Sequence, residues 1–180
     1  MLTKLIILII CIGLFLIVWS VFIFGTMVGL IRARGVPFVP LNKKQLSLIT
    51  KYVKLNPDDK LVDLGCGDGR VLRLFEKQSP AILDGYEVNF WATTLGWIQN
   101  LISHSKSKIY YKNFNKIDLS KYNIVFCYLL DTYLLRLRDK FDRELKPGTI
   151  IYSYDFEIKD WRRPVEIFKE NKSRIFIYKI

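Results

Sequence analysis

A strand that ends in glycines carries the residues best suited to binding a ligand. The apolar run Leu61–Leu64 predicts a buried strand that contains Asp63 and leads directly into Gly65, Gly67 and Gly69. A helical pattern follows at once, so strand, turn and helix form half of a nucleotide-binding βαβ unit. Glycines adopt positive φ and let a ligand come close to the backbone, which an adenosine-type ligand needs at such a turn. The alternative is a purely structural glycine turn between a core strand and a helix.

The spacing of the turn separates two kinds of cofactor. Asp-x-Gly-x-Gly-x-Gly is not the Gly-x-Gly-x-x-Gly of dinucleotide sites. It resembles motif I of the class I S-adenosylmethionine (SAM) methyltransferases. SAM has no pyrophosphate but carries an amino-acid ammonium group, which a carboxylate at Asp63 suits.

A second strand that ends in an acid supports this interpretation. Residues 81–87 read as that strand and end in Glu87. A carboxylate in this place can accept hydrogen bonds from both ribose hydroxyls. The alternative is that Glu87 is a solvated strand end. Together the two signals favour SAM binding.

The elements that position this site begin with an apolar segment. Residues 5–31 contain no charged side chain, and this stretch of 27 residues exceeds the ~20 that span a bilayer. The positive charge lies mostly after it, at Arg32, Arg34, Lys43 and Lys44, which predicts a cytoplasmic C-terminal domain. No Ala-x-Ala-like site closes the segment, so we expect an uncleaved single-pass anchor over residues 1–31.

Two glycines in the anchor raise the question of dimerisation. Gly25 and Gly29 form Gly-x-x-x-Gly, a spacing that lets two membrane helices approach closely. An apolar segment with three glycines contains this spacing easily by chance, so dimerisation through the anchor is the minor alternative.

The rest of the chain predicts one α/β domain. Residues 32–41 form a proline-containing linker, and residues 42–180 form the domain. Asn42 is expected to cap a helix to about Lys54, and Asp131 to cap another that Pro147 and Gly148 stop. The expected segments are helix 91–105 and strands 108–112, 123–129, 149–154, 165–168 and 174–178. Alternating strands and helices followed by two successive strands predict a Rossmann-like, mostly parallel sheet with an antiparallel terminal hairpin.

The net charge and the spacing of the cysteines indicate which binding partners to expect. The net charge is +11, and all but one unit of it lies after the anchor. A basic domain tethered to a bilayer is attracted by anionic lipid, whereas no recognised nucleic-acid module accompanies the charge, so we expect membrane contact and no nucleic acid. Cys11, Cys66 and Cys127 have neither metal nor redox spacing, and no metal site is predicted.

Several segments together resemble one group of methyltransferases. These are the apolar segment, Gly-Val-Pro-Phe-Val-Pro (35–40), motif I, Gly-Tyr-Glu-Val-Asn (85–89), Asp-Leu-Ser-Lys-Tyr (118–122) and Asp-Trp-Arg-Arg-Pro (160–164). The chain is similar to the membrane-anchored protein-lysine methyltransferases of mitochondrial inner-membrane proteins, such as the ATP synthase c-subunit and the adenine nucleotide translocase, and to their prokaryotic relatives.

This resemblance implies roles for individual residues. Asp63, Gly65, Cys66, Gly67, Asp68 and Gly69 would form the cofactor turn, Glu87 would bind the ribose, and Asn113, where the group usually has Asp, would accept from the adenine amino group. Tyr128, after the fourth strand, is the candidate for positioning the acceptor, or else an ordinary aromatic at a sheet edge. Phe38 and Trp161 are expected to wall the pocket or to lie in the core.

The resemblance implies a membrane-anchored SAM-dependent methyltransferase that modifies lysine in a membrane-associated protein. The alternatives are a methyltransferase of a lipid or membrane-soluble small molecule, and an inactive SAM-binding membrane adaptor.

Overall fold

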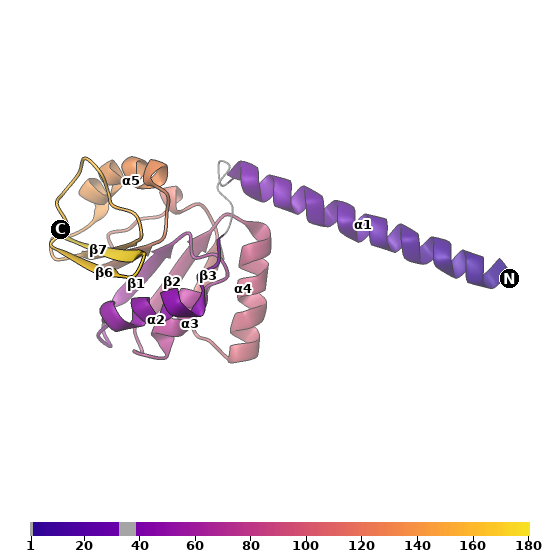
Figure 1. Ribbon diagram of the computed structural model, residues 1–180, viewed down its shortest axis with the longest axis horizontal. Coiled ribbons are helices and arrows are strands. Elements are labelled where there is room, and N and C mark those ends of the chain that lie inside the picture. The colour runs from indigo at the N-terminus through magenta and orange to yellow at the C-terminus, as the bar shows by residue number, and fades with distance from the viewer. Residues whose placement is uncertain (1, 33–38) are drawn as a thin grey trace.

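A seven-stranded sheet with the order β3-β2-β1-β4-β5-β7-β6 organises the domain. The computed structural model describes residues 2–32 and 39–180. The strands are β1 (Lys60–Leu64), β2 (Ile82–Glu87), β3 (Lys108–Tyr111), β4 (Ile124–Cys127), β5 (Ile150–Tyr154), β6 (Glu166–Glu170) and β7 (Ser173–Lys179). The first five are parallel, and β7 pairs antiparallel with both β5 and β6. The predicted Rossmann-like sheet with its antiparallel terminal hairpin is confirmed (Figure 1).

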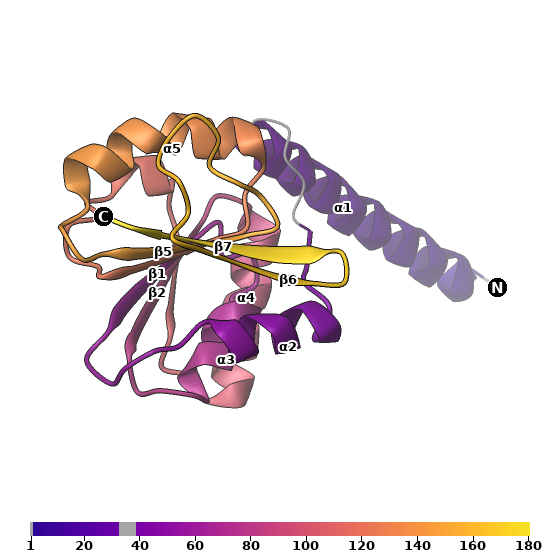
Figure 2. The same ribbon diagram turned by 60° about the vertical axis from the view of Figure 1, so that its left-hand side comes forward.

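Helices cover both faces of this sheet. The helical elements are α1 (Leu2–Arg32), which extends away from the sheet, and α2 (Lys43–Tyr52), α3 (Arg70–Glu76), α4 (Phe90–Ser103), the 3₁₀ turn η1 (Phe114–Lys116) and α5 (Asp131–Glu144). One face packs against α2, α3 and α4, and the other against α5 (Figure 2). The central strands β1 and β4 are therefore buried on both faces, as parallel strands usually are, which explains their largely apolar sequences.

Helix α2 begins at the cap predicted from the sequence, whereas α5 does not. Asn42 caps α2 through a capping box in which its side chain accepts from the Gln45 N–H, and the Gln45 side chain accepts from the Asn42 N–H. The expected cap at Asp131 is wrong, because Leu130 holds the cap position and Asp131 is the first helical residue. The Asp131 carboxylate instead pairs with Lys159 at 2.6 Å.

Helix α1 extends away from the domain and contacts it near its C-terminal end (Figure 1). Its segment Leu2–Val28 contains an 18-residue stretch with a mean hydropathy of 3.2 and is long and apolar enough to cross a membrane. The Phe22 ring lies 5.6 Å from that of Trp91 in α4, centroid to centroid. A Cβ on Gly25 would overlap the Trp91 ring, so Gly25 allows α1 to approach α4 of the same chain. Most of the predicted linker, residues 33–38 with Phe38, lies outside the described residues.

Candidate functional site

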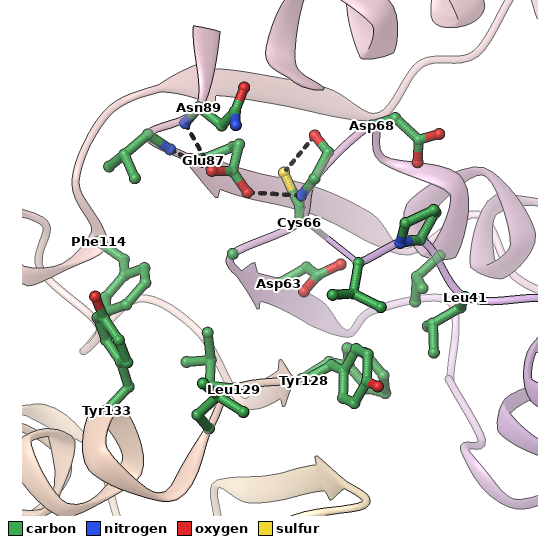
Figure 3. A pocket seen from close by; sticks show the side chains of 18 of the residues that line it. Leu41, Asp63, Cys66, Asp68, Glu87, Asn89, Phe114, Tyr128, Leu129 and Tyr133 are labelled. Carbon is green, nitrogen blue, oxygen red and sulfur yellow. Dashed lines mark hydrogen bonds between the residues drawn. The ribbon is translucent and has the colours of Figure 1, made fainter. Parts of the chain in front are cut away.

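The carboxyl ends of the central strands surround a cavity of about 240 Å³ (Figure 3). Its walls bring together most of the residues singled out from the sequence: Asp63, Gly65, Cys66, Gly67, Asp68, Glu87, Asn113 and Tyr128. Gly69 is the exception. It precedes α3 at φ 72°, and a Cβ there would overlap Ile109, so its role in this structure is to shape the turn.

Glu87 ends β2 and binds the glycine turn of β1. Its Oε2 accepts from the Gly67 N–H at 2.9 Å, and its Oε1 accepts from the N–H groups of Val88 and Asn89, both at 2.7 Å. A carboxylate offers about four acceptor sites, so roughly one remains for a ligand. Two ribose hydroxyls could both bind Glu87 only if one backbone donor were released.

Asp63 is a buried carboxylate without a hydrogen-bond donor among the described residues, and its side chain borders the cavity (Figure 3). Burial, reinforced by the negative charges of Glu87 and Asp68, raises the pKa of Asp63 well above 3.8. A carboxylate in this state gains most from a cationic partner, because a cation offsets both the desolvation and the repulsion. The site therefore fits a ligand that carries an ammonium group.

The raised pKa of Asp63 predicts a pH dependence of stability. As pH rises above 3.8, the unfolded chain loses the Asp63 proton before the folded chain does, so the free energy of unfolding of the ligand-free protein falls. We expect Asp63→Asn to remove this fall. Once the pH exceeds the pKa of Asp63 in the folded protein, the variant should be more stable than the wild type, by about 1.4 kcal/mol for each pH unit between the unfolded and folded pKa values. Denaturation of both proteins from pH 4 to pH 8 measures the difference. A constant difference across this range would contradict the prediction.

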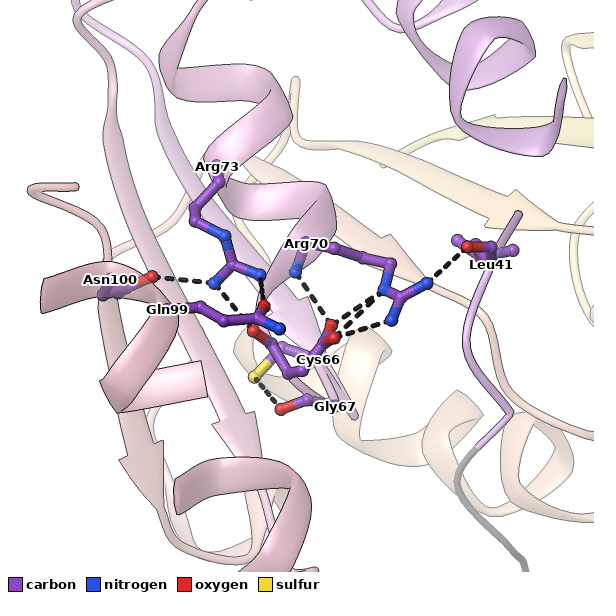
Figure 4. A network of polar contacts seen from close by, with 8 residues as sticks. Leu41, Cys66, Gly67, Arg70, Arg73, Gln99 and Asn100 are labelled. Carbon is purple, nitrogen blue, oxygen red and sulfur yellow. Dashed lines mark hydrogen bonds and ion pairs between the residues drawn. The ribbon is translucent and has the colours of Figure 1, made fainter. Parts of the chain in front are cut away.

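Asp68 forms an ion pair with Arg70, whose guanidinium also reaches Leu41 (Figure 4). Arg70 Nη2 lies 2.7 Å from Asp68 Oδ2, and Arg70 Nη1 donates to the Leu41 carbonyl at 2.6 Å. Since Val39, Pro40 and Leu41 line the cavity, this arginine fastens the segment before α2 to the glycine turn. Arg73 makes a parallel link from α3 to Gln99 and Asn100 of α4.

Removing Arg70 is expected to destabilise the domain. Arg70→Met leaves the fully buried Asp68 carboxylate without its cation, and we expect a loss of about 1–3 kcal/mol, moderated because Arg70 is itself partly exposed. Combining Arg70→Met with Asp68→Asn should recover much of the loss, because no buried charge remains unpaired. Thermal unfolding of the three proteins measures this, and equal stability of wild type and Arg70→Met would show that the pair contributes nothing.

Two further predicted residues, Asn113 and Cys66, border the cavity. Asn113 caps η1, where its Oδ1 accepts from the Asn115 N–H at 2.8 Å. One acceptor site of that oxygen remains free for a ligand. Burial and the charges of Asp63 and Glu87 raise the pKa of the Cys66 thiol well above 9.0, so Cys66 is a neutral wall residue and not a nucleophile.

Tyr128 follows β4 and lines the cavity. Its ring packs edge-to-face on Tyr154 at 5.3 Å and lies 5.9 Å from Phe156, while its hydroxyl has no hydrogen-bond partner in the part of the chain that the structure describes. Burial, and next the charge of Asp155, raise the pKa of Tyr128 above 10.0, so the phenol keeps its proton at neutral pH. A fixed ring with a free hydroxyl is suited to positioning a polar group.

Other walls of the cavity had been assigned no role from the sequence, although some of them lie in the segments 35–40 and 85–89 that carry the family resemblance. They include Val39–Leu41, Asn89, Phe114, Leu129, Tyr133, Arg136 and Phe156. The spacing Asp68-x-Arg70 was the sequence pattern that could have indicated the ion pair between these two residues. Trp161, by contrast, does not line the cavity among the described residues: it is partly buried against the core, where it packs on Phe141 and Tyr178 and donates to Asp142.

Comparison with known proteins agrees with this geometry. Residues 63–165 match the family described as the ANTKMT methyltransferase domain. A protein-lysine N-methyltransferase of Saccharolobus islandicus is 34% identical over 139 residues, which cover 74% of this chain and 84% of that protein. The ATP synthase c-subunit lysine N-methyltransferase of Homo sapiens is 27% identical over 152 residues, and the adenine nucleotide translocase lysine N-methyltransferase of Mus musculus 28% over 147. This chain spans 63% of each of these two relatives.

Solved structures share the fold. An RNA methyltransferase from Salinibacter ruber in complex with S-adenosyl-L-homocysteine superposes with a TM-score of 0.73, covering 79% of this chain and 94% of that one. The two sequences are 23% identical, so this likeness bears on the fold and not on the acceptor.

Proposed function

This chain belongs to the ANTKMT methyltransferase family, and from that premise we propose that it methylates lysine side chains of a membrane-associated protein. It is a SAM-dependent methyltransferase with a class I fold. The lysine acceptor is supported by the relatives, which are protein-lysine methyltransferases. The membrane location is supported by the length and apolar sequence of α1, which is the observation that carries the proposal, and α1 contacts the domain at α4.

Different residues of the cavity would bind different parts of the cofactor. Asp63 would pair with the ammonium group, since it is a buried carboxylate without a donor among the described residues. Gly65, Cys66 and Gly67 provide a close backbone wall, Glu87 has one acceptor site left for the ribose, and Asn113 has one for the adenine amino group. Asp68 and Gly69 would hold the turn in shape. SAM supplies a methyl group already activated by its sulfonium, so the protein has chiefly to align a nucleophile and exclude water.

The acceptor side of the cavity is aromatic. A lysine with a pKa near ~10.4 must lose its proton before it attacks, and a desolvated site favours the neutral amine. We assign the alignment of that amine to the free hydroxyl of Tyr128, which can accept a hydrogen bond from its N–H. Phe156 and Tyr154 fix the orientation of the Tyr128 ring.

Tyr128→Phe is therefore expected to lower kcat about tenfold while leaving the KM for SAM unchanged, because the hydroxyl would contact the acceptor and not the cofactor. Tyr110→Phe is a matched control, since Tyr110 stacks on Tyr86 outside the cavity. Steady-state transfer with a lysine-containing acceptor measures both. Unchanged kcat in Tyr128→Phe would remove this residue from the acceptor site.

The N-terminal helix supports the proposed membrane location. We propose residues 1–31 as a single-pass anchor, residues 32–41 as a linker and residues 42–180 as the catalytic domain on the cytoplasmic side, where the excess of positive charge lies. Trp91, the contact of α1, lies two residues after Asn89, which caps α4 and lines the cavity. The anchor thus attaches at the ligand-binding edge of the sheet, which places an acceptor close to the membrane surface within reach.

Transfer of label from SAM into membranes tests the proposal. Membranes incubated with the protein and methyl-labelled SAM are separated into protein and lipid, and we expect the label in protein. Label in lipid would favour the alternative small-molecule or lipid acceptor. SAM binding without any transfer would favour the inactive adaptor.

A further inference from the structure

Helix α4 has an outer face that is apolar and carries no charge. Leu101 and Ile102 are 78% and 73% exposed. The same face includes the exposed side chains of Phe90, Leu95, Trp97 and Ile98. Residues 88–105 contain no Asp, Glu, Lys or Arg. The opposite face of the helix, with Ala92, Thr93 and Gly96, is buried against the sheet.

Helix α5 shows what a solvated helix of this domain looks like. It has 14 residues, like α4, and also packs one face on the sheet. It carries eight charged residues: Asp131, Arg136, Arg138, Asp139, Lys140, Asp142, Arg143 and Glu144. Single exposed apolar residues are ordinary, but a contiguous uncharged face marks a contact with a partner or a membrane.

The apolar face of α4 is continuous with the candidate membrane span. Trp91, which contacts Phe22 and Gly25 of α1, is followed at helical spacing by Leu95, Ile98 and Ile102. In Figure 1, α4 lies across the direction of α1, on the side of the domain from which α1 leaves. If α1 crosses a bilayer, α4 then lies along the surface of that bilayer.

We infer that α4 is a second membrane contact, an interfacial helix whose outer face lies in the bilayer that α1 spans. This inference rests on the membrane location proposed above. An interfacial helix lies in the membrane plane with its apolar face buried among head groups and acyl chains. Tryptophan favours this depth, and the Trp97 Nε1–H already donates to the Ile109 carbonyl at 2.8 Å, so its ring enters the interface without an unsatisfied donor. The exposed Lys106 and Lys108, just beyond the helix, are suited to anionic head groups.

Two membrane contacts, the span α1 and the interfacial helix α4, would give the catalytic domain a fixed orientation. A single span lets a domain rotate about its axis, whereas a span and an in-plane helix hold it in one pose. Asn89 both caps α4 and lines the cavity. The mouth of the cavity is then held beside the membrane surface, where it would meet residues of a membrane protein that emerge from the bilayer.

Spin labels on the full-length chain test the inference. The chain is reconstituted into nanodiscs of phosphatidylcholine and phosphatidylglycerol, one copy per disc and without any other protein. Labels are placed singly at Ile98→Cys and Leu101→Cys, with Arg143→Cys on α5 and Leu14→Cys on α1 as matched references. Cys11 is replaced by alanine, and Cys66 and Cys127 are buried. Collision rates with oxygen, which concentrates in lipid, and with a water-soluble nickel chelate report depth.

We expect oxygen collisions to exceed nickel collisions severalfold at positions 98, 101 and 14, and the reverse at position 143. If positions 98 and 101 behave like 143 while 14 stays in lipid, the inference about α4 is wrong and the anchor stands; the face would then belong to a protein partner or a second copy. If position 14 is also in water, the anchor and the inference fall together. Neither outcome bears on lysine methylation, which is measured separately by label transfer.

Discussion

Glu87→Ala is expected to weaken SAM binding about 100-fold, the largest effect of any single substitution in the cavity. The change removes an acceptor for the ribose and also leaves the N–H groups of Gly67, Val88 and Asn89 without their partner. The loss of a charge-assisted hydrogen bond to the ligand, together with loosening of the glycine turn, amounts to about 3 kcal/mol. Isothermal titration of SAM into the purified protein measures it.

Glu87→Gln is the matched control for this prediction. The amide oxygen can still accept from two of the three backbone donors, so the turn should largely keep its shape, and we expect a loss of only about tenfold. If the alanine and glutamine variants bind SAM as tightly as the wild type, Glu87 serves the fold alone and the ribose is bound elsewhere.

Removing residues 1–31 is expected to reduce methylation of the membrane acceptor about 100-fold or more at low enzyme concentration, with SAM affinity almost unchanged. Every described residue that lines the cavity comes after this segment, which is why we expect the affinity to be retained. Tethering raises the effective concentration of enzyme at the membrane by a factor that free diffusion does not supply. Rates at several enzyme concentrations, with the natural membranes as acceptor, measure the effect.

A chimera separates the tether from the helix itself. Replacing residues 2–28 by an unrelated apolar span should restore part of the rate, because tethering needs only a span. Full recovery is expected only if Phe22 and Gly25 are kept at their positions, since they contact Trp91 and set the approach of α1 to α4. If the truncated chain methylates its acceptor as fast as the full-length chain, the anchor is incidental to function.

The parts of the structure that depend on local sequence were predictable. The glycine turn, the helix cap at Asn42 and the alternation of apolar runs each follow from short-range chemistry. The order of strands and helices along the chain then predicts a mostly parallel sheet with an antiparallel terminal hairpin, as observed. The same information places Asp63, Glu87 and Tyr128 at one sheet edge, because parallel strands present their carboxyl ends together.

The parts that depend on distant contacts were not predictable. Gly25 looked like half of a dimerisation spacing, whereas in the structure it accommodates Trp91 of the same chain. Arg70 reaches Leu41 across the entrance to α2, a contact that no local pattern encodes. Asp131 was misplaced by one position, because an acidic residue is favourable both at the cap and in the first turn of a helix.

We propose that this cavity transfers a methyl group from SAM to a lysine amine of a membrane protein. The most direct test of this proposal is mass spectrometry of membrane proteins after reaction with labelled SAM, comparing the wild type with Asp63→Asn. We predict labelled methyl groups on lysine residues that lie near the membrane surface, and their loss with Asp63→Asn. Label confined to lipids or to residues other than lysine, or equal lysine labelling by both proteins, would contradict the account.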